Sequence, residues 1–212
     1  GRCLRTKSDS PQYKGFTSCD FAADSAARDG AADTGFGVAC IANFINLTSL
    51  YFAMQLAFAL FHYFPYGGLE RDALAIARAC AARGHDVTIY TGSWQGDKPD
   101  DLPVVELGTR GWTNHARNAA FVHRLHEHLR EQKNVTVIGF NKMSGLDVYY
   151  AADVCFAQKA FEERNFFYRL TSRCRHFLMM ERAVFGADSR TQVLMIAQPQ
   201  FAIYQRYWHT QS

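Results

Sequence analysis

Apolar and polar positions along residues 55–207 form blocks that alternate between a strand-like and a helix-like period. The run from Leu56 to Phe61 is short, uncharged and bulky, which favours a strand buried on both faces of a parallel sheet. A turn with Pro65 and paired glycines follows, and from Leu69 the apolar residues recur with the period of a helix. The expected strands cover residues 55–61, 86–91, 104–107, 135–140, 146–154 and 193–197, and the expected helices cover 69–83, 113–133 and 199–207.

Strands that alternate with helices predict an α/β fold, a doubly wound parallel sheet of the Rossmann-like kind. Gly84 follows the first expected helix at a normal place for a left-handed C-cap. In such a sheet ligands bind at the carboxyl ends of the strands. The loops that matter for function are therefore residues 63–68, 141–145 and 153–159.

The glycine turn between the first strand and the first helix is a candidate anion site. Gly67 and Gly68 precede a helix start, where backbone N–H groups lack partners and the helix dipole favours an anion such as phosphate. A tight turn without a ligand explains the same pair of glycines. The dinucleotide fingerprint Gly-x-Gly-x-x-Gly is absent, and the second strand ends at Thr91 without an acid for a ribose.

Composition narrows the choice of partners. The net charge of +3 over 212 residues gives no basic field for nucleic acid. The six cysteines show no C-x-x-C pairs, so they indicate neither a zinc site nor a disulfide framework, and a reducing compartment is expected. The 17 Phe and 10 Tyr fit a large core, a stacking surface or a membrane-facing surface.

Residues 1–53 differ from the rest of the chain. Residues 1–33 have the composition of a poorly ordered segment, and no charged residue occurs from Thr34 to Leu69. A membrane span over 36–53 is disfavoured because polar residues such as Asn43 and Asn46 interrupt the apolar run. The regular pattern begins at Met54. We therefore interpret 1–53 as an extension of unclear origin and 54–212 as one Rossmann-like domain.

Several segments resemble a known family. In chain order they read FHYFPYGGLERD, ARGHDVTIYTGSWQGD, TNHARNAAF, VIGFNKMSGLDVYYAADVCFAQK and FYRLTSRCRHF. From Met54 to about Trp208 the chain resembles the amino-terminal half of the lipopolysaccharide core glucosyltransferase I family, which are family-four glycosyltransferases with the GT-B fold. Residues 1–53 have no counterpart in the family. The resemblance does not extend to the family's second domain, which binds most of the nucleotide and contains a pair of glutamates.

The resemblance implies a retaining transfer of glucose from UDP-glucose to a heptose of the lipopolysaccharide inner core. It implies no metal and no cofactor other than the donor substrate. The expected partners are a nucleotide sugar, the inner-core acceptor and an anionic membrane surface, with no nucleic acid. The expected location is the cytoplasmic face of the bacterial inner membrane, as a peripheral protein. Without the second domain, the chain is expected to be inactive alone.

The resemblance also assigns site residues. Gly67 and Gly68 match the loop that lies against the donor diphosphate, and Asp72 matches a position near the sugars. From the residues alone, Asp72 fits complementation of the helix dipole, shared with Glu70. Asp153 ends an expected strand, where a carboxylate fits proton abstraction from the acceptor hydroxyl or binding of acceptor hydroxyls. An N-cap role for Asp153 remains an alternative.

Two further clusters are candidates for the acceptor. Asn141 and Lys142 follow the fourth strand, where a lysine fits a phosphate as a point charge or is simply solvated. His115 and Arg117 lie at the start of the long helix, which Thr113 or Asn114 would cap, and their side chains fit contact with the phosphorylated inner core. The histidines at positions 123, 126 and 128 are expected to be surface residues.

Residues 156–185 form a basic, aromatic, amphipathic stretch. Their excess of cations over acids equals the +3 of the whole chain. At about 100° per residue, one apolar stripe contains Phe167, Leu170, Cys174, Phe177, Leu178 and Phe185. Such a helix fits an anionic membrane surface, and a core-packing helix with a solvated basic face fits the same pattern. The expected membrane contacts are Phe167, Arg169, Leu170, Arg173, Arg175 and Phe177.

Two other functions remain open. A nucleotide-binding oxidoreductase domain is disfavoured by the missing glycine fingerprint and by the missing ribose acid. A non-catalytic module that binds a membrane surface is the second alternative, and the domain alone would behave in that way.

Overall fold

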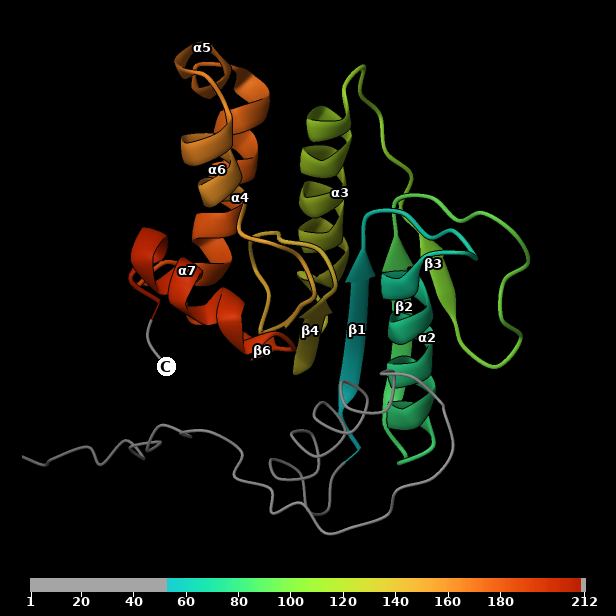
Figure 1. The fold of residues 1–212 in the computed structure, drawn as a ribbon. Helices are drawn as coiled ribbons and strands as arrows, with labels where there is room; N and C mark the ends of the chain where they lie inside the picture. The colour runs from blue at the N-terminus through green and yellow to red at the C-terminus, as the bar shows by residue number, and fades with distance from the viewer. Residues whose placement is uncertain (1–52, 211–212) are drawn as a thin grey trace, which may run out of the picture.

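The computed structural model describes residues 53–210, which contain a parallel sheet flanked by helices (Figure 1). The six strands lie in the order β3-β2-β1-β4-β5-β6, and every neighbouring pair is parallel. The strands are β1 (Gln55–Leu60), β2 (Asp86–Thr91), β3 (Val104–Glu106), β4 (Val135–Gly139), β5 (Val148–Ala151) and β6 (Gln192–Met195). The α/β doubly wound fold expected from the alternation is confirmed.

The helices cover both faces of the sheet (Figure 1). They are α2 (Gly68–Ala81), α3 (Asn114–Leu129), α4 (Phe156–Gln158), the π-helical turn η1 (Lys159–Glu163), α5 (Phe166–Arg169), α6 (Ser172–Phe185) and α7 (Gln198–Trp208). Gly84 has φ of 88°, so the left-handed residue expected after the first helix is present.

The strand order reverses between β1 and β4, which places the ligand crevice of this fold type at their carboxyl ends. Two contacts fix the backbone there. The backbone N–H of Phe61 donates to Asn141 Oδ1 at 2.8 Å, which joins the two strand ends. The rings of Tyr63 and Trp94 stack with their centroids 3.6 Å apart. The same two residues form an isolated parallel bridge, which extends the pairing of β1 and β2 beyond the regular strands.

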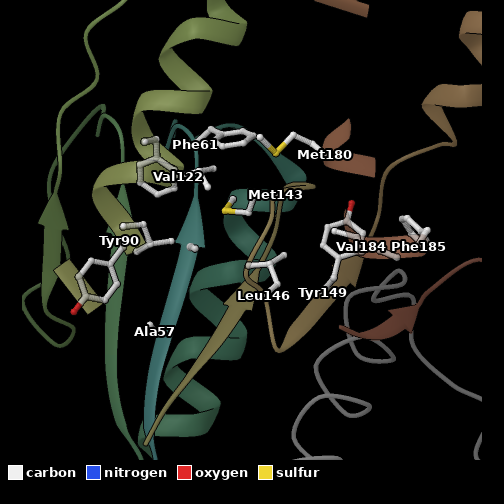
Figure 2. Packing of buried hydrophobic residues seen from close by; sticks show 14 of the residues in the cluster. Ala57, Phe61, Tyr90, Val122, Met143, Leu146, Tyr149, Met180, Val184 and Phe185 are labelled. Atoms are coloured by element: carbon white, nitrogen blue, oxygen red, sulfur yellow. The ribbon is translucent and has the colours of Figure 1, made fainter. Parts of the chain in front are cut away.

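Strand β1 is buried on both faces, as its apolar run predicts. One face of the sheet packs on α2, through Leu56, Phe58, Leu60, Ala73, Ile76, Ala77 and Cys80. The other face packs on α3 and α6 (Figure 2), through Ala57, Phe61, Phe121, Val122, Leu125, Val184 and Phe185. The alternation of side chains along β1 thus divides the core into two layers.

The stretch over 156–185 differs most from expectation. It is interrupted because Asn165 and Thr171 each start a new helix, with side-chain oxygens that accept from Tyr168 N–H and Cys174 N–H. The predicted apolar stripe is therefore not continuous, and its residues separate into a buried group and an exposed group. Cys174 and Phe185 are buried, whereas Phe167 and Leu170 are 77% and 56% exposed.

Some predictions fall on residues that the structure does not describe. These include nearly all of the span considered over 36–53 and of the extension that we assigned to residues 1–53. Within residues 53–210, no helix is both long and apolar enough to cross a bilayer. Cys80, Cys155 and Cys174 are free thiols and buried, as expected for small apolar side chains.

Candidate active site

Two consecutive tyrosines of β5 connect the two aspartates of the predicted site to the sheet. The Tyr150 hydroxyl donates to Asp72 Oδ2 at 3.2 Å, and the Tyr149 hydroxyl donates to Asp153 Oδ2 at 3.3 Å. Tyr150 belongs to the core layer on the α2 side and Tyr149 to the layer on the α6 side. One strand therefore positions both carboxylates. Sequence reasoning missed these tyrosines, although their place at the end of an apolar strand was visible.

The two glycines at the start of α2 have different surroundings: the Glu70 carboxylate packs against Gly67, and the space beside Gly68 is open. Gly67 is the N-cap and supplies no side-chain cap, while the carboxylate of Glu70 accepts a hydrogen bond from its own backbone N–H in the first turn. A Cβ on Gly67 would collide with the carboxylate of Glu70, whereas a Cβ on Gly68 would meet no atom within 4 Å. The missing Cβ of Gly67 thus makes room for the Glu70 carboxylate, and the space beside Gly68 can hold a ligand group.

The carboxylate of Glu70 lies beside Gly67, and its charge interacts with that of Asp153. Glu70 is only 7% exposed, and burial raises the pKa of its carboxyl above the ordinary value. The hydrogen bond from its own backbone N–H acts in the opposite direction, and the negative charge of Asp153 raises the pKa of Glu70 further. Asp72, Asp153 and the two glycines therefore lie along one rim of the sheet, with Glu70 among them.

The raised pKa of Glu70 predicts a pH dependence of stability. Between the ordinary value of 4.5 and the higher pKa of the folded state, the folded chain holds more protons than the unfolded chain. The free energy of unfolding should therefore fall as pH rises through this window. Glu70→Gln should reduce that fall, as measured by urea unfolding at a series of pH values. An identical pH profile in the variant would contradict the assignment.

Comparisons with known proteins identify the fold family. The family model described as Glycosyltransferase Family 4 matches residues 66–153, which include the glycine turn and both aspartates. The lipopolysaccharide glucosyltransferase WaaG of Escherichia coli (strain K12) is 47% identical over 158 residues. A crystal structure of WaaG, described as a glycosyltransferase involved in lipopolysaccharide biosynthesis, matches with a TM-score of 0.71. The described part of the chain has the fold of one Rossmann-like half of a GT-B glycosyltransferase, and its residues 66–153 match the family-four glycosyltransferases.

The match has a defined extent. It covers 74% of this chain and 42% of WaaG, both for the sequence and for the crystal structure. The chain therefore spans less than half of the length of WaaG. The Rossmann-like half of a GT-B glycosyltransferase that we expected from the sequence is confirmed.

Lys142 makes two contacts inside the protein, so it is not the solvated lysine that the sequence left as an alternative. Its Nζ forms an ion pair with Glu181 at 2.6 Å and donates to the Val154 carbonyl at 2.7 Å. The Lys142 side chain is 11% exposed and that of Glu181 is fully buried. Asn141 likewise binds the backbone of β1 through its amide oxygen. Both side chains therefore bind backbone groups of the segments that follow β1 and β5.

Glu181 is the buried anchor of the loop that carries Asp153. Its carboxylate accepts from Phe156 N–H at 2.6 Å, Ala157 N–H at 2.8 Å and Trp208 Nε1–H at 2.9 Å. The Tyr204 hydroxyl also donates to the Asp153 carbonyl at 2.8 Å. Asp153 is not the N-cap of α4, since Cys155 has that position. The loop therefore leaves the Asp153 carboxylate exposed while its backbone is held on both sides.

The basic stretch over residues 156–185 places its exposed aromatic residues on and around α5. Phe166 and Phe167 are 64% and 77% exposed, and sequence reasoning missed the first of them. Arg169 donates to the carbonyls of Ala160 and Phe161, so its guanidinium is partly used within the protein. Phe177 is half-buried under Arg173, whose guanidinium lies 5.7 Å from its ring, and Arg175 is exposed.

Proposed function

We propose that this chain supplies the acceptor-side half of a retaining glucosyltransferase that transfers glucose from UDP-glucose to a heptose of the lipopolysaccharide inner core. The observation that carries the proposal is the rim on which the glycine turn, Asp72 and Asp153 lie together. The 47% identity to a lipopolysaccharide glucosyltransferase supports the choice of reaction. The domain is proposed to be inactive without a second, donor-binding domain.

The proposed chemistry uses the rim in two parts. The diphosphate would lie beside Gly68, where the N-cap has no side chain and the N–H groups that start α2 would stabilise negative charge on the leaving group. Asp72 would bind the sugars from the second turn of α2. Asp153 would accept the proton of the attacking hydroxyl or hold the acceptor sugar. No cofactor beyond UDP-glucose is proposed.

A chimaera tests this function. The matching 42% of WaaG would be replaced by residues 54–208 of this chain, so that the donor-binding part is supplied by the relative. We expect glucose transfer from UDP-glucose to a heptose-terminated lipopolysaccharide acceptor. A chimaera that unfolds cooperatively on heating but transfers no glucose would contradict the proposal. Transfer with inversion would contradict the retaining mechanism.

The same chimaera decides between the proposal and the two alternatives. An oxidoreductase would bind NAD, but β2 ends at Thr91, whose side chain donates to the Ser93 carbonyl, and no acid stands there for a ribose. If calorimetry detects binding of NAD and no binding of UDP-glucose, the oxidoreductase alternative is favoured. A non-catalytic membrane module would bind vesicles and show no transfer in the chimaera.

We also propose a peripheral position at the cytoplasmic face of the inner membrane. The exposed side chains of Phe166, Phe167 and Leu170 lie beside a surplus of arginines, which fits the interface of an anionic bilayer. Because the proposed acceptor is part of a lipid in the membrane, such a surface would hold Asp72 and Asp153 close to that acceptor.

Removing the exposed aromatic rings should weaken membrane binding. The double change Phe166→Ser and Phe167→Ser removes two side chains that would each gain about 1.5–3 kcal/mol on burial, so affinity should fall by at least roughly tenfold. Cosedimentation with anionic vesicles at low salt measures this. Ile196→Ser, which removes an exposed apolar side chain near β6, should leave binding unchanged. Equal loss in both variants would contradict a role for α5.

A further inference from the structure

The loop between β3 and α3 holds a tryptophan in water. Trp112 is fully exposed, although the residues on either side of it are fixed to α3. A Cβ on Gly111 would lie 3.0 Å from the backbone nitrogen of Arg117, so the loop packs closely on the first turn of the helix. Thr113 is the N-cap of α3, and its hydroxyl accepts from Ala116 N–H. The backbone is therefore held on both sides of the exposed indole.

The base of the same loop is attached as well. The Arg124 guanidinium donates to the carbonyls of Leu107 and Gly108 at 2.6 and 2.7 Å. Residues 108–113, which we call the Trp112 loop, are thus connected to α3 where the loop leaves β3 and again where it enters the helix. The exposure of Trp112 follows from a defined backbone path, and a large apolar side chain in that position suggests a surface that binds a partner.

The Trp112 loop lies near the exposed apolar side chains of α5. His115 Nε2 is 3.4 Å from the Ser172 hydroxyl, which brings the first turn of α3 to the first turn of α6. Trp112 lies just before His115 in the chain, and Leu170 lies just before Ser172. Figure 1 shows the loop before α3 and the helix α5 at the same end of the molecule. The exposed apolar residues at this end are Trp112, Phe166, Phe167 and Leu170.

The two segments that meet at this end have only positive charges. Residues 107–117 and 164–176 contain six arginines and neither aspartate nor glutamate. Arg110 is exposed in the Trp112 loop, and Arg173 and Arg175 are exposed at the start of α6. Indole rings favour the headgroup level of a bilayer, and arginines there are attracted by anionic lipids. Stacking of Trp112 on a sugar would use neither the neighbouring apolar side chains nor the surplus of arginines.

We propose that the Trp112 loop is a second membrane-contact segment, whose indole enters the headgroup region of an anionic bilayer together with the exposed side chains of α5. The inference rests on the peripheral position proposed above and adds a segment outside residues 156–185. Contact through two segments that are far apart in sequence fixes the orientation of the domain on the bilayer. Since the helices of this fold start at the carboxyl edge of the sheet, that orientation turns the edge with Asp72 and Asp153 towards the lipid.

Tryptophan fluorescence of this chain tests whether the indole enters the bilayer. The probe is a vesicle of equal parts phosphatidylcholine and phosphatidylglycerol with brominated acyl chains, which quench an indole on contact. We expect saturable quenching for the unchanged chain and its loss in Trp112→Phe. The remaining fluorescence should be unaffected, because Trp94 stacks on Tyr63 and the Trp208 indole N–H donates to Glu181 inside the protein.

Vesicle cosedimentation measures how much the indole contributes to binding. Trp112→Ser should weaken the affinity for the same vesicles without bromine by roughly tenfold, the effect of one large apolar side chain that is no longer buried. Tyr66→Ser is the matched control, since Tyr66 is 94% exposed and precedes α2, which covers the opposite face of the sheet. It should bind like the unchanged chain. Thermal unfolding of each variant controls for loss of fold.

The outcomes separate this inference from the peripheral position itself. Equal quenching of Trp112→Phe and the unchanged chain, or equal affinity of Trp112→Ser and the unchanged chain, would overturn the role of the loop. A response of Trp112 to a lipid-free heptose oligosaccharide but not to vesicles would replace the bilayer with a saccharide and also overturn it. If only the double change at Phe166 and Phe167 weakens binding, α5 remains the contact and the Trp112 loop is excluded. If only Trp112→Ser weakens binding, the loop is retained and α5 is excluded.

Discussion

Glu181→Ala is expected to lower the free energy of unfolding of this chain by about 3–5 kcal/mol, the usual loss when one partner of a buried ion pair is removed. The change leaves Lys142 charged in a site where its side chain is 11% exposed. It also leaves the N–H groups at the start of α4 and the Trp208 indole N–H without their acceptor. Because a domain is stable by only about 5–15 kcal/mol, the effect is large in urea unfolding.

Matched variants make this prediction specific. Glu163→Ala removes an exposed carboxylate from the same region and should change stability by less than about 0.5 kcal/mol. The double variant Glu181→Gln with Lys142→Met should be more stable than Glu181→Ala, since it leaves no unpaired buried charge. If Glu181→Ala and Glu163→Ala unfold at the same urea concentration, the buried anchor is not a stabilising element.

Asp153→Asn in the chimaera should lower kcat for glucose transfer by about 10²–10⁴-fold, the usual range for loss of a general base. An amide cannot accept the proton of the attacking hydroxyl, although it can still accept the hydrogen bond from Tyr149. The KM for UDP-glucose should change little, because the proposed diphosphate site is at the glycine turn. Initial rates at saturating acceptor separate these effects.

Asp86→Asn is the control for that measurement. Asp86 is an exposed aspartate at the amino end of β2, at the opposite edge of the sheet from Asp153. It should retain full turnover. Full turnover in Asp153→Asn would remove the base role, and an unchanged kcat with a raised acceptor KM would leave Asp153 as a residue that binds the acceptor sugar.

Much of the fold was predictable because its signals are local. The apolar run of β1, the glycines before α2 and the left-handed Gly84 each follow from the conformational preferences of a few neighbouring residues. The position of both aspartates at the rim followed from the general placement of strand ends in a parallel sheet. The break before α6 was also readable, since Asn165 and Thr171 are good N-cap residues inside a supposed helix.

The contacts that shape the site were not predictable in this way. Lys142 and Glu181 are 39 residues apart in sequence, and Tyr150 and Asp72 are 78 apart. No local period or motif connects such pairs, so the sequence left Lys142 open between a phosphate contact and a solvated side chain. Glu70 was assigned to the helix dipole, and its proximity to Asp153 depends on the packing of α2 against the sheet.

The adjacent tyrosines of β5 make the spacing of the two aspartates intolerant of insertions. Successive side chains of a strand point to opposite faces, so one added residue within β5 would exchange the layers into which the two phenols extend. Both carboxylates would then lose their donors in a single genetic event. Lengthening the segment around α5, which has no strand register to preserve, would leave this arrangement intact, so natural variation in length should accumulate there and be absent from β5.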